Sequence, residues 1–412
     1  MRILLCGINY APDLIGVAKY NVELCEGLAA LGHEVRVITA PPYYPAWQVP
    51  VAYRGLSYRS ETIDGIAVKR APIYVPKLPS GARRLLHHAS FALTSAPPLL
   101  ATARRWRPQV VFSVAPSLMS SALAARAARW FGAASWLHVQ DFEVDAAFEL
   151  GLLRNSRLRN AMFGVERTIL KSFDRVSTIS PQMMRGLERK GVPGDRIREL
   201  RNWIDIGQIV PGNRMTAFRT ELGYGASDVI ALYSGNMSSK QGLELIVDAA
   251  RALKDEPNLR FILCGEGPQK AALQAMAADL RNVHFLGLQP NDRFAQLLIT
   301  ADIHIIAQRA EAADLVLPSK LGGILASGRP LVAMAAPGTG LSNEVEGAGL
   351  AVPPSDAYAF AQTLRKLSAD GAMRDTLGAA ARKRAEARWD RAAIVKILEG
   401  ELTEVAAKTS RA

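Results

Sequence analysis

The sequence has little cysteine and no long hydrophobic run. Its 412 residues include three cysteines, at positions 6, 25 and 264, and no C-x-x-C pair. This odd, widely spaced set supports neither a disulfide framework nor a zinc knuckle, and it indicates a reducing compartment. The longest apolar stretch, 89–103, falls short of the roughly 18 to 20 residues that cross a bilayer. We expect Pro97 and Pro98 to interrupt it and to prevent one continuous helix. The N-terminus lacks the features of a signal peptide. We therefore expect a cytoplasmic protein.

Acidic residues are missing from one long segment. The 76 residues from Gly65 to Gln140 contain no acid and ten bases. These are Lys69, Arg70, Lys77, Arg83, Arg84, Arg104, Arg105, Arg107, Arg126 and Arg129. Residues 1–200 hold 26 bases and 15 acids, whereas residues 201–412 hold 24 and 23. The asymmetry predicts a polyanionic partner. Because nucleic-acid-binding motifs are absent, we favour an anionic membrane surface, with peripheral attachment at the inner face of the cytoplasmic membrane.

The apolar segments of the chain alternate between strand and helix patterns. Strands are expected at 3–6, 35–39, 110–113, 134–139 and 176–179, and again at 229–233, 260–264, 283–285, 303–306 and 330–334. Helical stretches lie between many of them, which predicts α/β architecture with parallel sheets. We expect two tandem Rossmann-like domains, 1–203 and 204–385, and a helical tail, 386–412. Open parallel sheets bind ligands at the carboxyl ends of their strands, so two such domains are expected to face a cleft.

The loop after the first strand ends at Gly16, directly before a helical stretch. A glycine at the start of a helix lets an anionic ligand approach free backbone N–H groups. An ordinary glycine-bearing turn is the alternative. The loop does not have the G-x-G-x-x-G spacing of dinucleotide-binding oxidoreductases.

A polar group of residues follows the strand at 134–139. His138 and Gln140 alternate onto one side of the chain, and Asp141 lies at the carboxyl end of the strand. Glu143 and Asp145 follow, after the long segment without acids. A carboxylate cluster at the end of a strand in a basic domain is a candidate site, although a lone strand histidine is usually structural.

The first loop of the second domain suits a phosphate. Ser234, Gly235 and Asn236 precede Lys240 and Gln241, so small residues that admit close backbone approach are followed by a cation. A polar turn with a solvated lysine is the alternative. The order of residues is not that of a Walker A loop.

Two further loops in the second domain are candidates. Gly265, Glu266 and Gly267 follow the strand at 260–264, although a lone G-x-G is a weak signal. The segment 308–320 combines cations, acids and a Pro-Ser turn before a helix, where Ser319 is expected as the N-cap and Lys320 one residue inside. A helix N-terminus with free N–H groups can bind an anion, and a solvated charged loop is the alternative.

Five blocks of this sequence, taken in order, resemble glycosyltransferase family 4. They are 7–12, 39–45, 138–145, 233–236 and 317–321, and they are most similar to the fucosyltransferase-like enzymes of colanic-acid biosynthesis. The resemblance implies the GT-B fold, a nucleotide-sugar donor on the second domain, an acceptor on the first, and retention at the anomeric carbon. It implies neither a metal nor another cofactor.

The resemblance also assigns roles to individual residues. It implies catalytic roles for His138, Gln140, Asp141, Lys240 and Arg309. It implies donor binding by Gly16, Ser234, Gly235, Asn236, Gln241, Gly265, Glu266, Gly267, Asp314, Pro318, Ser319 and Lys320. Backbone N–H groups and cations would stabilise the departing diphosphate, as an oxyanion hole does.

Several positions depart from the family pattern. Gln140 and Asp141 stand where the family has His-Asp, and Asn236 stands where it has arginine. The lysine of the same loop aligns with Gln241, and the second glutamate of the paired-glutamate motif aligns with Gly323. We align the first glutamate with Asp314.

The sequence therefore predicts a retaining, metal-independent glycosyltransferase. It would move a sugar, with fucose as the candidate, from a nucleotide-sugar donor to a lipid-linked saccharide in bacterial exopolysaccharide biosynthesis. A nucleotide-sugar epimerase of the same architecture and a non-catalytic polyanion-binding protein are the alternatives.

Overall fold

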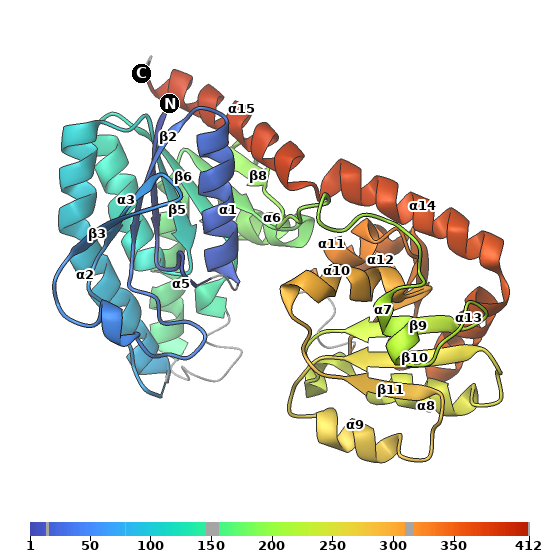
Figure 1. Cartoon of the computed structure of the whole chain (residues 1–412). Coiled ribbons are helices and arrows are strands. Elements are labelled where there is room, and N and C mark those ends of the chain that lie inside the picture. The colour runs from blue at the N-terminus through green and yellow to red at the C-terminus, as the bar shows by residue number, and fades with distance from the viewer. Residues whose placement is uncertain (14–15, 79, 146–155, 310–316, 411–412) are drawn as a thin grey trace. The chain divides into compact units, whose positions relative to one another are not determined.

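The computed structural model describes residues 1–13, 16–78, 80–145, 156–309 and 317–410 (Figure 1). The chain forms two compact units, Met1–Arg201 with Ile394–Ala412, and Asn202–Ala393. The chain leaves the first unit at Arg201 and returns to it for the last helix, so the segment expected as a separate tail is divided between the units. Each unit is built on a parallel sheet with helices packed on it, which confirms the predicted α/β fold.

The first unit contains an eight-stranded sheet in the order β3-β4-β2-β1-β5-β6-β7-β8. All its strand pairs are parallel except that of β3 with β4. Its strands are β1 Arg2–Gly7, β2 Glu34–Thr39, β3 Arg59–Ile63, β4 Ile66–Arg70, β5 Val110–Ala115, β6 Ala134–Val139, β7 Arg175–Thr178 and β8 Ile197–Glu199. Buried side chains fill β5, β6 and β7 throughout, as is typical of parallel strands covered on both faces.

Helices pack on this sheet through separate apolar clusters. The helices are α1 Val17–Ala30, α2 Gly81–Trp106, α3 Leu118–Trp130, α5 Ser156–Lys171 and α6 Pro181–Arg189, and the 3₁₀ turns are η1 Val51–Tyr53 and η2 Gly194–Arg196. One cluster joins Leu4 and Val111 of the sheet to Leu99 of α2. The last helix, α15 Arg391–Thr409, joins this unit through the Arg198–Glu401 ion pair at 2.8 Å.

The hairpin of β3 and β4 was not predicted. It turns at Asp64 and Gly65, which both have positive φ, at 48° and 79°. An Asp-Gly pair between short alternating segments is a recognised hairpin signal, and the sequence contains it. The last residue of β4, Arg70, is buried. Its Nε lies 2.5 Å from Glu61 Oε1 of β3, and its Nη1 donates to the Ala40 carbonyl at 2.8 Å. Arg70 is therefore an internal ion-pair residue and not part of a basic surface.

The expectation that Pro97 and Pro98 break the apolar segment 89–103 is wrong, because α2 runs through both of them. A proline at 98 removes the N–H that would bond the Thr94 carbonyl. The Tyr58 hydroxyl donates to that carbonyl instead, at 2.9 Å. The carbonyl that Pro97 leaves free belongs to Leu93, which is 74% exposed to solvent. No helix in the described parts of the chain is long and apolar enough to cross a membrane.

The second unit contains a six-stranded parallel sheet in the order β11-β10-β9-β12-β13-β14. Its strands are β9 Val229–Ser234, β10 Leu259–Cys264, β11 Val283–Leu286, β12 Ile303–Ile306, β13 Leu331–Met334 and β14 Gly349–Val352. The helices are α7 Ala217–Glu221, α8 Glu244–Ala252, α9 Lys270–Met276, α10 Asn291–Thr300, α11 Leu321–Ala326, α12 Gly340–Val345, α13 Ala357–Ala369 and α14 Gly371–Arg388, with the 3₁₀ turn η3 Ser239–Gln241.

Alternate residues of β9 enter different apolar clusters. Ala231 and Tyr233 pack in the cluster that includes α8 and α13, whereas Ile230 and Leu232 pack with residues of α7 and α10. This two-residue alternation buries both faces of the sheet. The ten strands predicted from the sequence are all present, and those missed are β3, β4, β8 and β14.

Gly378 gives a test of packing in the second unit. A Cβ at this position in α14 would overlap the backbone carbonyl oxygen of Gly328. We expect Gly378→Ala to lower the free energy of unfolding by about 1 to 3 kcal/mol, because backbone must move to admit the methyl group. Urea unfolding followed by circular dichroism measures the change. Gly371→Ala in the same helix is the control, since its Cβ would meet only the end of the Arg374 side chain at 3.6 Å. Equal stability of the two variants would contradict this packing.

Candidate active site

Two loops at the carboxyl edge of the second sheet are bonded to each other. Gly235 N–H donates to the Cys264 carbonyl at 2.9 Å, and Met237 N–H donates to the Glu266 carbonyl at 2.9 Å. Gln269 N–H donates back to the Met237 carbonyl at 2.9 Å. The loop after β9 and the loop after β10 therefore form one unit.

Glycine is required where these loops touch. A Cβ on Gly265 would overlap the Gly235 carbonyl oxygen, and a Cβ on Gly267 would overlap that of Met237. Both glycines also have positive φ, at 146° and 155°. The contact between the loops is thus sufficient to explain the G-x-G pattern, and donor contacts from Gly265 and Gly267 stay predictions. Glu266 is paired with Lys270, 2.6 Å away.

Lys320 supplies a cation beside the first of these loops. Its Nζ lies 3.9 Å from the centroid of the Tyr233 ring, and an ideal Cβ built on Gly235 would be 3.2 Å from the same Nζ. The Tyr233 hydroxyl donates to the Asn236 carbonyl at 2.7 Å, which fixes ring and loop together. Burial lowers the pKa of Lys320 to about 7. Within the described ranges, no carboxylate forms an ion pair with this lysine.

The buried Ser234 hydroxyl lies next to this loop. Ser234 is 4% exposed, and its Oγ has no hydrogen-bond partner in the described part of the structure. A buried hydroxyl without a partner is uncommon, since most buried polar side-chain atoms are hydrogen-bonded. Ser234 and Lys320 are therefore two predicted donor-binding residues whose polar side-chain groups stay available in the described structure.

The expected cap of α11 is wrong by one residue. Lys320, and not Ser319, occupies the N-cap position, and Ser319 is exposed. The turn closes through backbone bonds, from Leu321 N–H to the Pro318 carbonyl at 2.9 Å and from Ile324 N–H to the Lys320 carbonyl at 3.1 Å. No side chain caps the helix. The start of α11 directs Lys320 toward Tyr233.

Arg309 holds the loop from 238 to 244. Its Nε donates to the Ser239 carbonyl at 2.8 Å, and its Nη2 is bonded to the Glu244 carboxylate. Gln241 is similarly engaged, because its Oε1 accepts from the backbone N–H of Ser238 at 3.2 Å and from the hydroxyl of the same residue. Both side chains shape the loop, and their predicted contact with the donor would require these bonds to rearrange.

Two predicted residues have no described side-chain environment. The backbone of Lys240 lies in η3, but its side chain is not described. Asp314 lies outside the described residues. Their predicted roles stay predictions.

His138 in β6 of the first unit has both ring nitrogens occupied. The Gln140 amide donates to Nε2 at 2.9 Å, so Nδ1 carries the proton and lies 3.0 Å from Ser177 Oγ. The Trp136 indole N–H also donates to Ser177, at 2.8 Å. Burial lowers the pKa of His138 to about 3. The histidine is therefore neutral and positions Gln140 at the end of the strand.

The three acids after β6 differ in their partners. Asp141 is exposed. Glu143 accepts from the backbone N–H groups of Ser117 and Leu118, the latter at 3.1 Å, and so caps α3. Burial raises the pKa of Glu143 to about 7. Of the three residues, Asp141 is the most exposed.

Asp145 belongs to a buried ion-pair group that sequence reasoning missed. Lys190 Nζ lies 2.6 Å from Asp145 and 2.5 Å from Glu166, and it packs over the rings of Phe142 and Phe163 at 4.9 and 4.8 Å. These residues lie up to 45 positions apart in the sequence, so no local sequence pattern predicts the contact. The group anchors the loop that carries Asp141.

Gly16 lies at the N-cap of α1 with φ 60° and ψ −132°. A Cβ there would meet nothing within 4 Å, so its surface is open. The neighbouring Asp13 carboxylate accepts from the N–H groups of Tyr43 and Tyr44 at 3.0 and 3.2 Å, which joins the loops after β1 and β2.

In the parts of the chain that are described, no three His, Cys, Asp or Glu side chains are grouped as a metal site would require.

Two family models match this chain. A glycosyl transferase 4-like domain matches residues 16–203, and a glycosyl transferases group 1 domain matches residues 228–370. The two matches follow the two units of the structure.

Relatives and solved structures agree with these matches. The Escherichia coli protein WcaI, named as a colanic acid biosynthesis glycosyl transferase, is 43% identical over 89% of this chain and 92% of its own. Sucrose-phosphate synthase from Thermosynechococcus elongatus has a TM-score of 0.73 at 20% identity, covering 99% and 100% of the two chains. Anabaena HepE in complex with UDP has a TM-score of 0.71 at 16% identity, covering 98% and 100%. The domain matches and the relative together show that the chain belongs to the family 4 glycosyltransferases with the GT-B fold.

Proposed function

We propose that this glycosyltransferase moves a sugar from a nucleotide-sugar donor to a lipid-linked saccharide in exopolysaccharide biosynthesis. The observation that carries the donor part is the half-buried Lys320, which lies beside Gly235 without a carboxylate partner in the described structure. The solved complex of HepE with UDP supports a nucleotide donor, and the name of WcaI supports colanic acid as the product. Family membership favours transfer over the epimerase and polyanion-binding alternatives.

Stabilisation of the leaving diphosphate is the chemical task of this site. As the bond to the sugar breaks, negative charge develops on the diphosphate, and preorganised donors lower the barrier. In this proposal the Lys320 ammonium beside Gly235 is the main donor, because the N–H groups of Gly235 and Met237 already bond the neighbouring loop. The Ser234 hydroxyl is a further candidate donor. Arg309 and Gln241 keep the adjoining loop in place.

Retention at the anomeric carbon is the stereochemistry that we propose. In this route the leaving phosphate accepts the proton of the acceptor, so the enzyme needs no strong base. The environment of His138 supports this, because both ring nitrogens are bonded and its pKa is about 3. Gln140 and Asp141 would bind the acceptor at the carboxyl edge of β6. Fucose stays the proposed sugar.

Replacement of Lys320 tests the donor site. We expect Lys320→Met to lower kcat by about 10² to 10³, because a donor aimed at the developing charge is lost. Initial rates of transfer from the nucleotide sugar measure this. Lys366→Met is the control, since Lys366 is exposed on α13. Equal rates in both variants would refute the role of Lys320.

The same lysine predicts a pH dependence. Its pKa of about 7 in the free protein means that the ammonium is lost as pH rises from 6 to 8.5. Nucleoside diphosphate binding should therefore weaken over this range, by up to tenfold per pH unit above the pKa, because the bound anion requires the proton. Calorimetric titration measures the affinity. Lys320→Arg, which stays charged, should bind with a flatter pH profile.

Metal independence is a separate proposal. We expect full transfer activity after exhaustive treatment with EDTA, because cations of the protein would take the place of a metal at the diphosphate. The measurement compares chelated enzyme with and without added magnesium or manganese. Activity that disappears on chelation and returns with either ion would contradict the proposal.

We also propose peripheral attachment to an anionic membrane through the N-terminal half of α2. Leu86 and Leu93 are 54% and 74% exposed there, beside the exposed Arg83. Phe91 and Leu99 of the same helix are fully buried and take no part in this surface. A second basic group, Arg104 and Arg105, lies about 30 Å from Arg83 along the helix, because an α-helix rises 1.5 Å per residue. The two basic groups therefore do not form one patch.

Vesicle sedimentation tests this attachment. We expect Arg83→Glu with Leu86→Ser to weaken binding to phosphatidylglycerol vesicles, because it removes a cation and apolar contact from the same surface. Arg104→Glu with Arg105→Glu is the matched control at the other end of the helix and should bind nearly as wild type does. High salt should weaken wild-type binding. Equal binding to neutral vesicles, or a larger effect from the control, would contradict this orientation.

A further inference from the structure

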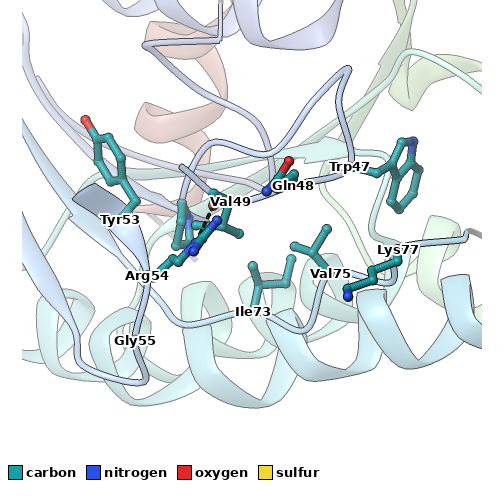
Figure 2. A pocket seen from close by; sticks show the side chains of 10 residues that line it. Trp47, Gln48, Val49, Tyr53, Arg54, Gly55, Ile73, Val75 and Lys77 are labelled. Carbon is teal, nitrogen blue, oxygen red and sulfur yellow. Dashed lines mark hydrogen bonds between the residues drawn. The ribbon is translucent and has the colours of Figure 1, made fainter. Parts of the chain in front are cut away.

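A hollow of about 470 Å³ lies in the first unit, at the carboxyl edge of its sheet. Its wall comes from the segments that follow β2 and β4, and from η1. Figure 2 shows Trp47 and Tyr53 at opposite ends, with Val49, Ile73 and Val75 between them. Since neighbouring strands lie about 4.8 Å apart, β2 lies roughly 14 Å from β6 in the sheet, and β4 lies one step further away. The proposed acceptor residues at the end of β6 have no part in it.

The ring at one end of the hollow is held in place by its neighbours. The Trp47 ring lies 5.6 Å from that of Tyr43 and 5.3 Å from that of His87, and the Arg84 guanidinium lies over it at 5.3 Å. His87 is itself fully buried and is bonded to the Tyr74 carbonyl at 2.6 Å.

The ring at the other end is held by cations. The Arg59 and Arg70 guanidinium groups lie 4.7 and 5.0 Å from the centre of the Tyr53 ring. Arg59 also donates to the Ala52 carbonyl at 2.6 Å, which fixes the turn. Both aromatic ends are thus positioned before any ligand arrives, and the hollow is preformed.

The charged groups of the hollow are all positive. Arg54 and Lys77 contribute to its lining, and no acid does. Arg54 Nε donates to the Val49 carbonyl at 3.1 Å, which leaves its other guanidinium N–H groups for a ligand (Figure 2). The nearby Glu61 carboxylate is bonded to the buried Arg70. The hollow therefore favours an anion.

Exposed apolar side chains adjoin the lining segments. Val51 and Leu56 flank the Tyr53–Gly55 segment, and they are 76% and 91% exposed. Leu78 follows Lys77 and is 72% exposed. A hydrocarbon chain lying over these side chains would remove apolar surface from water, which favours its binding. An apolar hollow with cations and an apolar surround matches an anionic head group on a hydrocarbon chain.

We propose that this hollow binds the phosphate end of the lipid that carries the acceptor saccharide. The phosphate is held by Lys77 and Arg54, and the first part of the hydrocarbon chain lies against Val49, Ile73 and Val75. The saccharide then extends along the edge of the sheet to the end of β6, which suits a chain of a few sugar residues. This inference rests on the proposed transfer to a lipid-linked saccharide.

Binding of a soluble lipid phosphate tests the site directly. Decyl phosphate, below its micelle concentration, is titrated calorimetrically into the full-length protein, alongside inorganic phosphate and the neutral decyl glucoside. We expect decyl phosphate to bind at least tenfold more tightly than either, because both of its parts make contacts. Lys77→Ala with Arg54→Ala should weaken its binding at least tenfold. Lys366→Ala should not.

Several results of this titration would overturn the inference. Equal affinity for inorganic phosphate would show that the chain is not bound, and equal affinity for decyl glucoside would show that the charge is not recognised. Unchanged binding of decyl phosphate by the double variant would place its site elsewhere. A thermal melt within about 2 °C of wild type establishes that the double variant is folded.

Acceptor kinetics separate this inference from the proposed function. In the double variant, KM should rise at least tenfold for a lipid phosphate-linked acceptor, with kcat unchanged. The same saccharide on a short neutral aglycone should react equally with wild type and variant. Hydrolysis of the donor without acceptor should also be equal. Unchanged KM for the lipid-linked acceptor refutes the hollow as its site, whereas no transfer by wild type to either acceptor refutes the proposed function.

Discussion

The contact between the loops after β9 and β10 is the constraint on which the second-unit site depends. The backbone of Gly265 lies so close to the carbonyl of Gly235 that a Cβ on Gly265 would overlap the carbonyl oxygen. This contact fixes the Gly235 loop, and the Tyr233 hydroxyl fixes it from the other side through the Asn236 carbonyl. Lys320 then lies on the Tyr233 ring with its ammonium beside the loop. The cation is therefore placed by packing before any diphosphate binds, which is the preorganisation that charge stabilisation requires.

The cationic side chains differ in whether a carboxylate of the protein is paired with them. Arg70 is buried with Glu61, Lys190 lies between two carboxylates, and Arg309 is bonded to Glu244. Each of them shapes a loop. Lys320 and, in the first unit, Lys77 have no carboxylate partner within the described residues. Lys320 is half-buried, and a half-buried cation without a partner is costly, so the anion of a ligand would stabilise it, whereas Lys77 is exposed to solvent.

The acid-free segment that begins at Gly65 has three different structural roles. Arg70 stabilises the hairpin of β3 and β4 from inside the unit. Phe91 and Leu99 bury α2 against the sheet. Arg83 and Leu86 lie on the exposed side of the same helix. One stretch of sequence thus supplies core residues, an ion pair and surface residues. Within α2 the core and surface residues alternate because an α-helix has 3.6 residues per turn.

The sequence alone determined the α/β class, the predicted strands and the loops that carry Gly235 and Lys320. These depend on local patterns, since parallel strands are apolar runs and ligand loops follow their carboxyl ends. Tertiary structure decided which charged side chains are free. The residue pairs Arg309 with Glu244 and Lys190 with Asp145 lie 65 and 45 positions apart, and their contacts come only from folding. Tertiary structure likewise continued α2 through Pro98, because the hydroxyl of Tyr58, 36 positions from Thr94 in the sequence, bonds the carbonyl that proline leaves free.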